Sequence, residues 1–214
     1  PITLANLIQD TIRAYNEPPL QIPLFFRWLR WLLPSWQPGA NKQHNLGYSA
    51  DIWRDASLEV FNVIGHRRDL ISSPPIEAKN MSIERLSQIS DLLYCNLHGL
   101  ETAAEWFGES ISFDGQIPQY PVALRPSDIH HGQAPSIVFT EACYGANIIM
   151  KQSSEDALCL HFLQSGSRAI VGSTRISYGA VGIPLIGADL IGRFFWHHLR
   201  EGLRIGEALR RSRM

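Results

Sequence analysis

The chain has 214 residues, 45% of them hydrophobic and 18% charged, and a formal net charge of −1 at pH 7. This composition is ordinary for a globular protein with a sizeable core, and the absence of a basic excess predicts no nucleic-acid partner. No run of about 18 apolar residues occurs, so we expect no membrane span.

The first part of the chain is expected to be mainly helical. Apolar residues at helical spacing predict a helix over 2–15. For the aromatic-rich stretch 23–34, a helix leading into the core is favoured over one lying on a membrane surface. The segment 35–47 is rich in Pro, Gly, Asn and Gln and predicts a loop. A helix over 49–63, with Ser49 as N-cap and Asp51 in its first turn, and a short helix over 82–90 should follow.

Three later stretches have the pattern of buried strands. They are mainly apolar and cover 91–97, 135–143 and 168–174, and the second of them is also rich in β-branched residues. Helices are expected over 155–165 and 187–200, with a last one from residue 205. Strands alternating with helices predict an α/β domain with a mostly parallel sheet flanked by helices, and we expect one such domain over 1–214.

Reactive side chains follow two of these strands. His98-Gly99 comes after the first, and Cys143 ends the second, two residues before Gly145. In a parallel sheet, ligands bind beyond the carboxyl ends of the strands, so neighbouring strands would bring His98 and Cys143 to one edge. An imidazole next to a thiol is the arrangement that activates a sulfur nucleophile at neutral pH.

The segment 108–134 separates the two reactive residues and is long for a connection. We expect it to be exposed and mobile without a substrate or partner, and limited proteolysis should cut it first. Preferential cutting within 155–174 would contradict the predicted strands and helices. His130 and His131 are rival bases or metal ligands, but adjacent side chains in an extended chain point to opposite faces.

The remaining cysteines give no sign of a metal centre. Cys95, Cys143 and Cys159 cannot all pair, and their spacing is not typical of a zinc site. We therefore expect no metal and no cofactor. Free thiols favour a reducing compartment, so we expect a cytoplasmic location.

Several segments resemble the gingipain-type branch of the caspase-like cysteine peptidases. The stretch 94–102 (YCNLHGLET) resembles the strand, His-Gly and Glu-Thr of that family, with Trp106 a few residues later. The stretch 139–145 (FTEACYG) resembles the family's strand and Ala-Cys nucleophile, and 171–174 (VGST) its next strand. The first 16 residues resemble a family helix.

This resemblance implies a caspase-like three-layer sandwich and a peptidase dyad. Cys143 would attack the peptide carbonyl, His98 would transfer the proton, and the backbone N–H groups of Gly99 and Cys143 would form an oxyanion hole. The residues that follow Thr174, through Tyr178, match segments that help wall the primary specificity pocket. Four side chains at the carboxyl end of the third strand are therefore expected to contact the substrate: Ser173, Thr174, Ser177 and Tyr178. The expected partner is a protein or peptide substrate.

The family's upstream part has no counterpart in the chain, which begins at Pro1 and not at a methionine. We therefore expect a piece of a larger protein, whose other domains or second chain would be partners. Two other functions use the same fold. One is a catalytically silent domain that mediates protein interaction, and the other is thiol-dependent acyl transfer such as amide ligation.

The resemblance also implies a hypothesis about specificity. Ser49-Ala-Asp51 falls where the family carries pocket acids, and Asp55 lies one helical turn later. A pocket for a basic side chain needs a carboxylate, because an unpaired buried cation is costly. The enzyme would then cleave after Arg or Lys, and Asp51→Asn or Asp55→Asn would weaken that preference. Alternatively, Asp51 complements a helix dipole and Asp55 is simply solvated.

Overall fold

The computed structural model describes residues 45–80, 91–110, 118–149, 151 and 153–214. The chain divides into two units between Lys42 and Gln43, and the described residues all belong to the second. The helices expected over 2–15, 23–34 and 82–90 lie outside the described residues. A single domain over 1–214 therefore stays a prediction.

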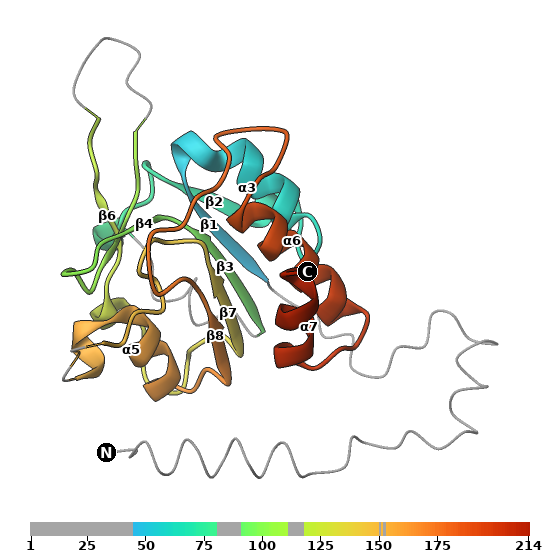
Figure 1. Cartoon of the computed structure of the whole chain (residues 1–214). Coiled ribbons are helices and arrows are strands. Elements are labelled where there is room, and N and C mark those ends of the chain that lie inside the picture. The colour runs from blue at the N-terminus through green and yellow to red at the C-terminus, as the bar shows by residue number, and fades with distance from the viewer. Residues whose placement is uncertain (1–44, 81–90, 111–117, 150, 152) are drawn as a thin grey trace. The chain divides into compact units, whose positions relative to one another are not determined.

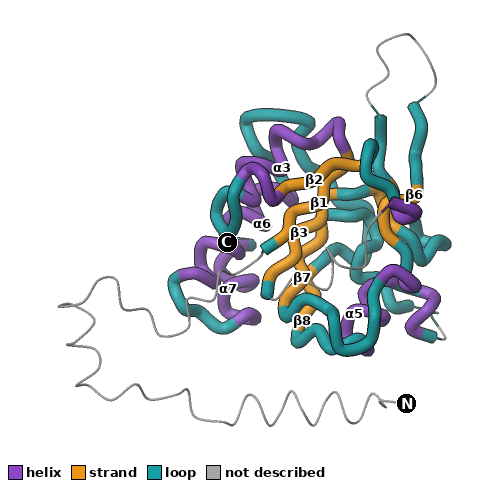
Figure 2. Tube along the Cα trace, turned by 180° about the vertical axis from the view of Figure 1, so that it is seen from behind, coloured by secondary structure: helices purple, strands orange, loops and turns teal. Residues whose placement is uncertain are grey.

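Five parallel strands form the main sheet (Figures 1 and 2). Their order across the sheet is β2-β1-β3-β7-β8. The strands are β1 (Leu46–Ala50), β2 (Leu70–Ser73), β3 (Leu92–Asn96), β7 (Ile137–Thr140) and β8 (Ala169–Val171). The predicted α/β fold with a mostly parallel sheet flanked by helices is confirmed.

Successive side chains of the central strands enter two different cores, because side chains alternate between the faces of a sheet. Leu93 and Val138 belong to the core on one face, which includes α5 (Leu158–Gln164). Tyr94 and Phe139 belong to the core on the other face. Three helices cover that second face (Figure 1): α3 (Arg54–Phe61), α6 (Ala188–Arg200) and α7 (Ile205–Ser212). Helices on both faces of the sheet make three layers.

A small antiparallel sheet continues the chain beyond β3. Its strands are β4 (His98–Gly99), β5 (Trp106–Phe107) and β6 (Val122–Leu124). Trp106 and Leu124 are buried in the same core as α5. The short 3₁₀ turns are η1 (Asp51–Trp53), η2 (Arg67–Asp69), η3 (Ala78–Asn80), η4 (Pro126–Asp128) and η5 (Ser154–Asp156).

The expected helix over 49–63 is wrong at its start, and the loop over 35–47 is wrong at its end. Residues 46–50 form β1, and the α-helix begins only at Arg54. Ser49 is no N-cap: its buried hydroxyl lies 2.7 Å from the hydroxyl of Ser57. Pairing with β2 and β3 on both sides overrides the weak local pattern of this short segment.

The described part of the segment 108–134 is only partly exposed. It contains β6 and η4, and it buries Ala123 and Leu124 completely. Residues 111–117 lie outside the described residues. The remaining predicted elements are confirmed with shorter bounds, since β8 ends at Val171 and leaves Ser173 and Thr174 beyond the strand.

Within the described residues, no helix is both long and apolar enough to cross a membrane.

Candidate active site

β3 and β7 are parallel neighbours, as predicted, and their register aligns the two reactive residues. Cys95 pairs with Thr140 in the last step of the ladder. His98 and Cys143 each follow three residues later, so both lie just beyond the carboxyl ends of adjacent strands. They line one cavity of about 160 Å³, whose full lining is Trp53, Asn96, Leu97, His98, Glu141, Cys143, Ser177, Tyr178, Gly179 and Ala180.

The turn after β7 presents the Cys143 thiol to this cavity. The Ser177 N–H donates to Sγ at 3.3 Å, and Sγ lies 3.5 Å from the Ser177 carbonyl oxygen. Tyr144 has φ of 56°, an uncommon conformation for a residue other than glycine. Such local strain is held only where the surroundings determine it, and it accompanies many reactive turns.

The backbone N–H groups of this turn differ in whether they already donate to a backbone carbonyl. The Tyr144 N–H donates to the Arg175 carbonyl at 2.8 Å, and the Gly145 N–H to the Ala142 carbonyl at 2.9 Å. Among the described residues, no backbone acceptor takes the N–H of Cys143. This N–H is therefore available to an oxygen placed next to Sγ.

Gly99 packs directly against the backbone of this turn. A Cβ atom at residue 99 would collide with the Cys143 carbonyl oxygen, which is backbone and cannot swing away. Only glycine lets the two strand-end turns approach so closely. This contact places the backbone of Gly99 beside the nucleophile turn.

We expect Gly99→Ala to lower the free energy of unfolding by about 1–3 kcal/mol, the usual cost of overpacking. For a chain of this size, the melting temperature should fall by roughly 2–4 °C per kcal/mol. The matched control is Gly206→Ala in α7, where no atom lies within 4 Å of the added Cβ. Equal melting temperatures for the two variants, measured by circular dichroism, would contradict this close packing.

His98 is held by a carboxylate and by two aromatic rings. Its Nε2 lies 2.8 Å from Oε2 of Glu109, a residue just beyond β5. The ring lies against Trp53, with centroids 4.3 Å apart, and meets Tyr120 edge-on at 5.1 Å. Because a carboxylate oxygen accepts a hydrogen bond, this contact places the proton of a neutral imidazole on Nε2 and leaves Nδ1 as the acceptor.

Glu109 is itself fixed by the fold. Its N–H donates to the Ser73 carbonyl at 3.1 Å, where β2 ends. Its carboxylate side chain is only 12% exposed. The preceding Gly108 lies so close to Ser73 that a Cβ atom would overlap the serine. This partner of His98 could not be predicted from the sequence, since Glu109 lies in a segment expected to be a mobile loop.

A second carboxylate, which also could not be identified from the sequence, lines the cavity. Glu141 lies two residues before Cys143 and is only 6% exposed. Its Oε1 accepts the Tyr94 hydroxyl at 2.7 Å, whereas its Oε2 is buried and has no partner among the described residues. Burial and the neighbouring Asp189 hold the pKa of Glu141 well above its usual range.

The two acids expected in the pocket are not brought to it. Asp51 lies half-buried in η1, directly after β1, and Asp55 is exposed on the first turn of α3. Neither lines the cavity that His98 and Cys143 share. The physical reason is the extra strand β1, which moves the start of the helix from residue 49 to residue 54. Trp53 occupies the cavity wall on this side.

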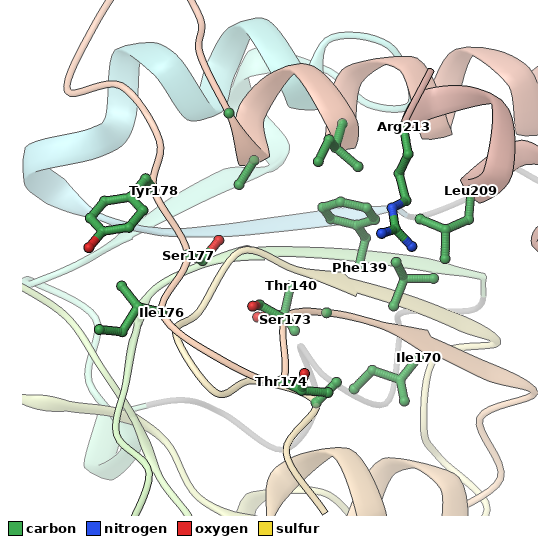
Figure 3. A pocket seen from close by; sticks show the side chains of 16 residues that line it. Phe139, Thr140, Ile170, Ser173, Thr174, Ile176, Ser177, Tyr178, Leu209 and Arg213 are labelled. Atoms are coloured by element: carbon green, nitrogen blue, oxygen red, sulfur yellow. The ribbon is translucent and has the colours of Figure 1, made fainter.

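The four polar residues expected around the pocket line a larger cavity of about 630 Å³ (Figure 3): Ser173, Thr174, Ser177 and Tyr178. Ser177 and Tyr178 also line the smaller cavity, so the two cavities are adjacent. Phe139 and Leu209 give the larger one an apolar wall, and Arg213 reaches it from the end of α7.

The other thiols and the histidine pair do not contribute to the site. Cys95 and Cys159 are buried, which raises the pKa of both thiols. His130 and His131 are exposed. In the parts of the chain that the structure describes, no cluster of His, Cys, Asp and Glu could hold a metal ion.

No protein-family model matches the chain, and no curated protein matches it closely enough to count as a relative.

Proposed function

We propose that the protein is a cysteine endopeptidase of the gingipain-type, caspase-like kind, which cleaves after basic residues. The observation that supports this most strongly is the shared cavity of Cys143 and His98 beyond two adjacent parallel strands. The same cavity contains a buried carboxylate oxygen of Glu141 that has no partner within the described residues. Nucleophile, base and a site for a cation therefore occur together.

In the proposed reaction, His98 acts through Nδ1. This nitrogen takes the Sγ proton, and the Cys143 thiolate attacks the carbonyl carbon of the scissile peptide bond. The new C–S bond gives a tetrahedral oxyanion. Protonated His98 then gives its proton to the leaving amine, the C–N bond breaks, and a thioester remains on Cys143.

Hydrolysis of the thioester reverses these roles. His98 removes a proton from water, the hydroxide attacks the thioester carbonyl, and the C–S bond breaks to regenerate the thiol and release the acid. The N–H of Cys143, which has no backbone acceptor among the described residues, would donate to the oxyanion together with the N–H of Gly99. These bonds would form both when the thioester forms and when it is hydrolysed. The Ser177 N–H donates to Sγ and so holds the nucleophile at the wall of the cavity.

The preference for Arg or Lys rests on Glu141 and no longer on Asp51 or Asp55. An ammonium or guanidinium group that entered the cavity would supply the partner that Oε2 lacks. Tyr178 is 75% exposed at the mouth of both cavities, so it would cover the bound side chain. Ser173 and Thr174, in the larger cavity, are proposed to contact neighbouring residues of the peptide.

A positional-scanning peptide library tests the proposed activity. Wild-type protein should cleave peptides with Arg or Lys before the scissile bond, and each product should be a free acid and a free amine. A preference for Asp, Asn or a small apolar residue would contradict the basic pocket. Absence of any cleavage by folded protein would favour a silent interaction domain, and joined peptides would show ligation.

Glu109→Gln should lower kcat by at least about 10-fold and leave KM nearly unchanged. The amide can donate to Nε2 as well as accept from it, so it no longer fixes the tautomer in which Nδ1 accepts the thiol proton. Stopped assays with an arginyl peptide from pH 5 to 9 would show this. Glu105→Gln, a nearby acid that does not line the cavity, is the control. Equal kcat for both variants would remove Glu109 from the mechanism.

A further inference from the structure

Behind Glu141 lies a second carboxyl group that the proposed mechanism does not use. Asp189, in the first turn of α6, is 0% exposed. Its Oδ2 accepts the Ala180 N–H at 2.6 Å and the Ile186 N–H at 3.4 Å. These bonds tie the loop that walls the cavity to the start of the helix. Asp189 itself does not line the cavity, so any influence on a ligand must pass through Glu141.

Each of the two acids has one carboxyl oxygen that accepts no hydrogen bond from the described residues. These oxygens, Glu141 Oε2 and Asp189 Oδ1, are both buried. The Glu141 carboxyl lies against Gly192, about one turn after Asp189 on α6, and it interacts with the Asp189 carboxyl. As two carboxylates, neither could donate to the other. A single proton between them would satisfy both oxygens at once, as in other close carboxyl pairs.

Among the described residues, neither Lys nor Arg lines the cavity. Tyr94 of β3 donates its hydroxyl to Glu141, and the other ionisable groups at the cavity are His98, Cys143 and Tyr178. Two arginines of the covering helices are engaged elsewhere: Arg54 binds the Leu70 carbonyl, and Arg193 pairs with Glu59. Within the described residues, neither Lys nor Arg forms an ion pair with either acid.

We propose that Asp189 determines the specificity of the pocket through Glu141, because the two acids share one proton that a basic substrate side chain displaces. This inference rests on the proposed function, since it assigns a proton-linked binding step to the same cavity. The two backbone N–H groups hold the Asp189 carboxyl in place. Burial disfavours the charged form of Glu141 and raises its pKa, so the proton is on Glu141 in the free protein. A guanidinium at Oε2 then takes the place of that proton, which leaves to solvent.

A direct consequence is that affinity for a basic side chain depends on pH. While the pair holds its proton, binding an arginyl peptide should strengthen by up to about tenfold per pH unit. Once Glu141 is ionised in the free protein, the affinity should level off. A peptide with citrulline, which has the shape of arginine without its charge, should show no such rise.

Titration calorimetry counts the released proton. The protein is Cys143→Ala, which prevents turnover, and the ligands are two peptides that end in arginine or citrulline. Titrations at pH 6 in two buffers of different ionisation enthalpy give the number of protons released. We expect about one for the arginyl peptide and about none for the citrullyl peptide.

Asp189→Asn in the same Cys143→Ala background distinguishes proton release by the acid pair from proton release by His98, which also lines the cavity. The Asn oxygen can still accept the Ala180 N–H, while its amide N–H can donate to Glu141 Oε2 and keep Glu141 ionised. Proton release should disappear, and the affinity for the arginyl peptide should no longer vary between pH 5 and 7. The control is Glu207→Gln, which removes the charge of a carboxylate paired with Arg210 on the surface of α7. It should behave as the parent protein, Cys143→Ala.

The outcomes are distinguishable. Equal proton release with and without Asp189→Asn, or binding of the arginyl peptide without proton release, overturns the inference and leaves the proposed peptidase intact. If neither peptide binds and wild type cleaves neither, the proposed function and this inference both fail. If Asp189→Asn does not fold, carbon-13 NMR of wild type decides: a glutamate carboxyl that stays protonated well above the ordinary glutamate pKa of about 4.3, and is absent from Glu141→Gln, supports the shared proton.

Discussion

Cys143→Ala and His98→Ala are each expected to abolish peptide hydrolysis while the fold is retained. Each variant is expected to lose about 10⁴-fold or more in kcat, and the double variant should be hardly worse than either single one, because the two residues act as a unit. Both side chains border a cavity and are only partly buried, so their removal leaves the two cores intact. Steady-state assays with an arginyl peptide and melting curves measure the two effects separately.

The matched control is Cys159→Ala, which removes a thiol from α5 without touching the cavity. It should keep near-normal turnover at a modest cost in stability. Near-normal turnover by Cys143→Ala would show that another group is the nucleophile. Strictly additive losses in the double variant would show that His98 and Cys143 act in separate steps.

Glu141→Gln should remove the preference for basic residues and leave the chemistry working. The amide is nearly isosteric and still accepts the Tyr94 hydroxyl, but it offers no charge to a guanidinium. The loss in kcat/KM for an arginyl peptide should correspond to roughly 2–5 kcal/mol, the typical cost of removing one partner of a buried charge pair. Hydrolysis of the matching citrullyl peptide should change little.

The comparison variants are Asp51→Asn and Asp55→Asn, at the two acids that the sequence singled out. Because neither lines the cavity, both are expected to keep the arginine preference. If Asp51→Asn abolished that preference and Glu141→Gln did not, then Asp51, and not Glu141, would be the carboxylate that binds the basic side chain. The ratio of kcat/KM for the two peptides decides, since it cancels any common effect on the dyad.

The reactive edge could be predicted because its determinants are local. Buried apolar strands that are followed closely by His98-Gly99 and Cys143 have a recognisable pattern, and the parallel register then aligns the two side chains. In contrast, β1 contains Gly47, Ser49 and Ala50 and has little strand pattern of its own. It is a strand because two neighbours pair with it, which is a tertiary effect.

The supporting carboxylates could not be predicted for a related reason. Glu109 meets His98 only after a hairpin forms, and Asp189 meets Glu141 only after α6 packs on the sheet. A single acid in a sequence is most often a solvated surface residue. Its burial, and hence its altered chemistry, depends on contacts between elements that are distant along the chain.

Covalent labelling with an arginyl acyloxymethyl ketone, followed by mass spectrometry of the digested protein, tests the Cys143–His98 dyad and its basic pocket together. We expect one adduct per chain, on Cys143, that disappears in His98→Ala and forms much more slowly with the citrullyl reagent. Modification of Cys95 or Cys159 instead, or equal labelling by both reagents in wild type and His98→Ala, would contradict a Cys143–His98 peptidase with a basic pocket.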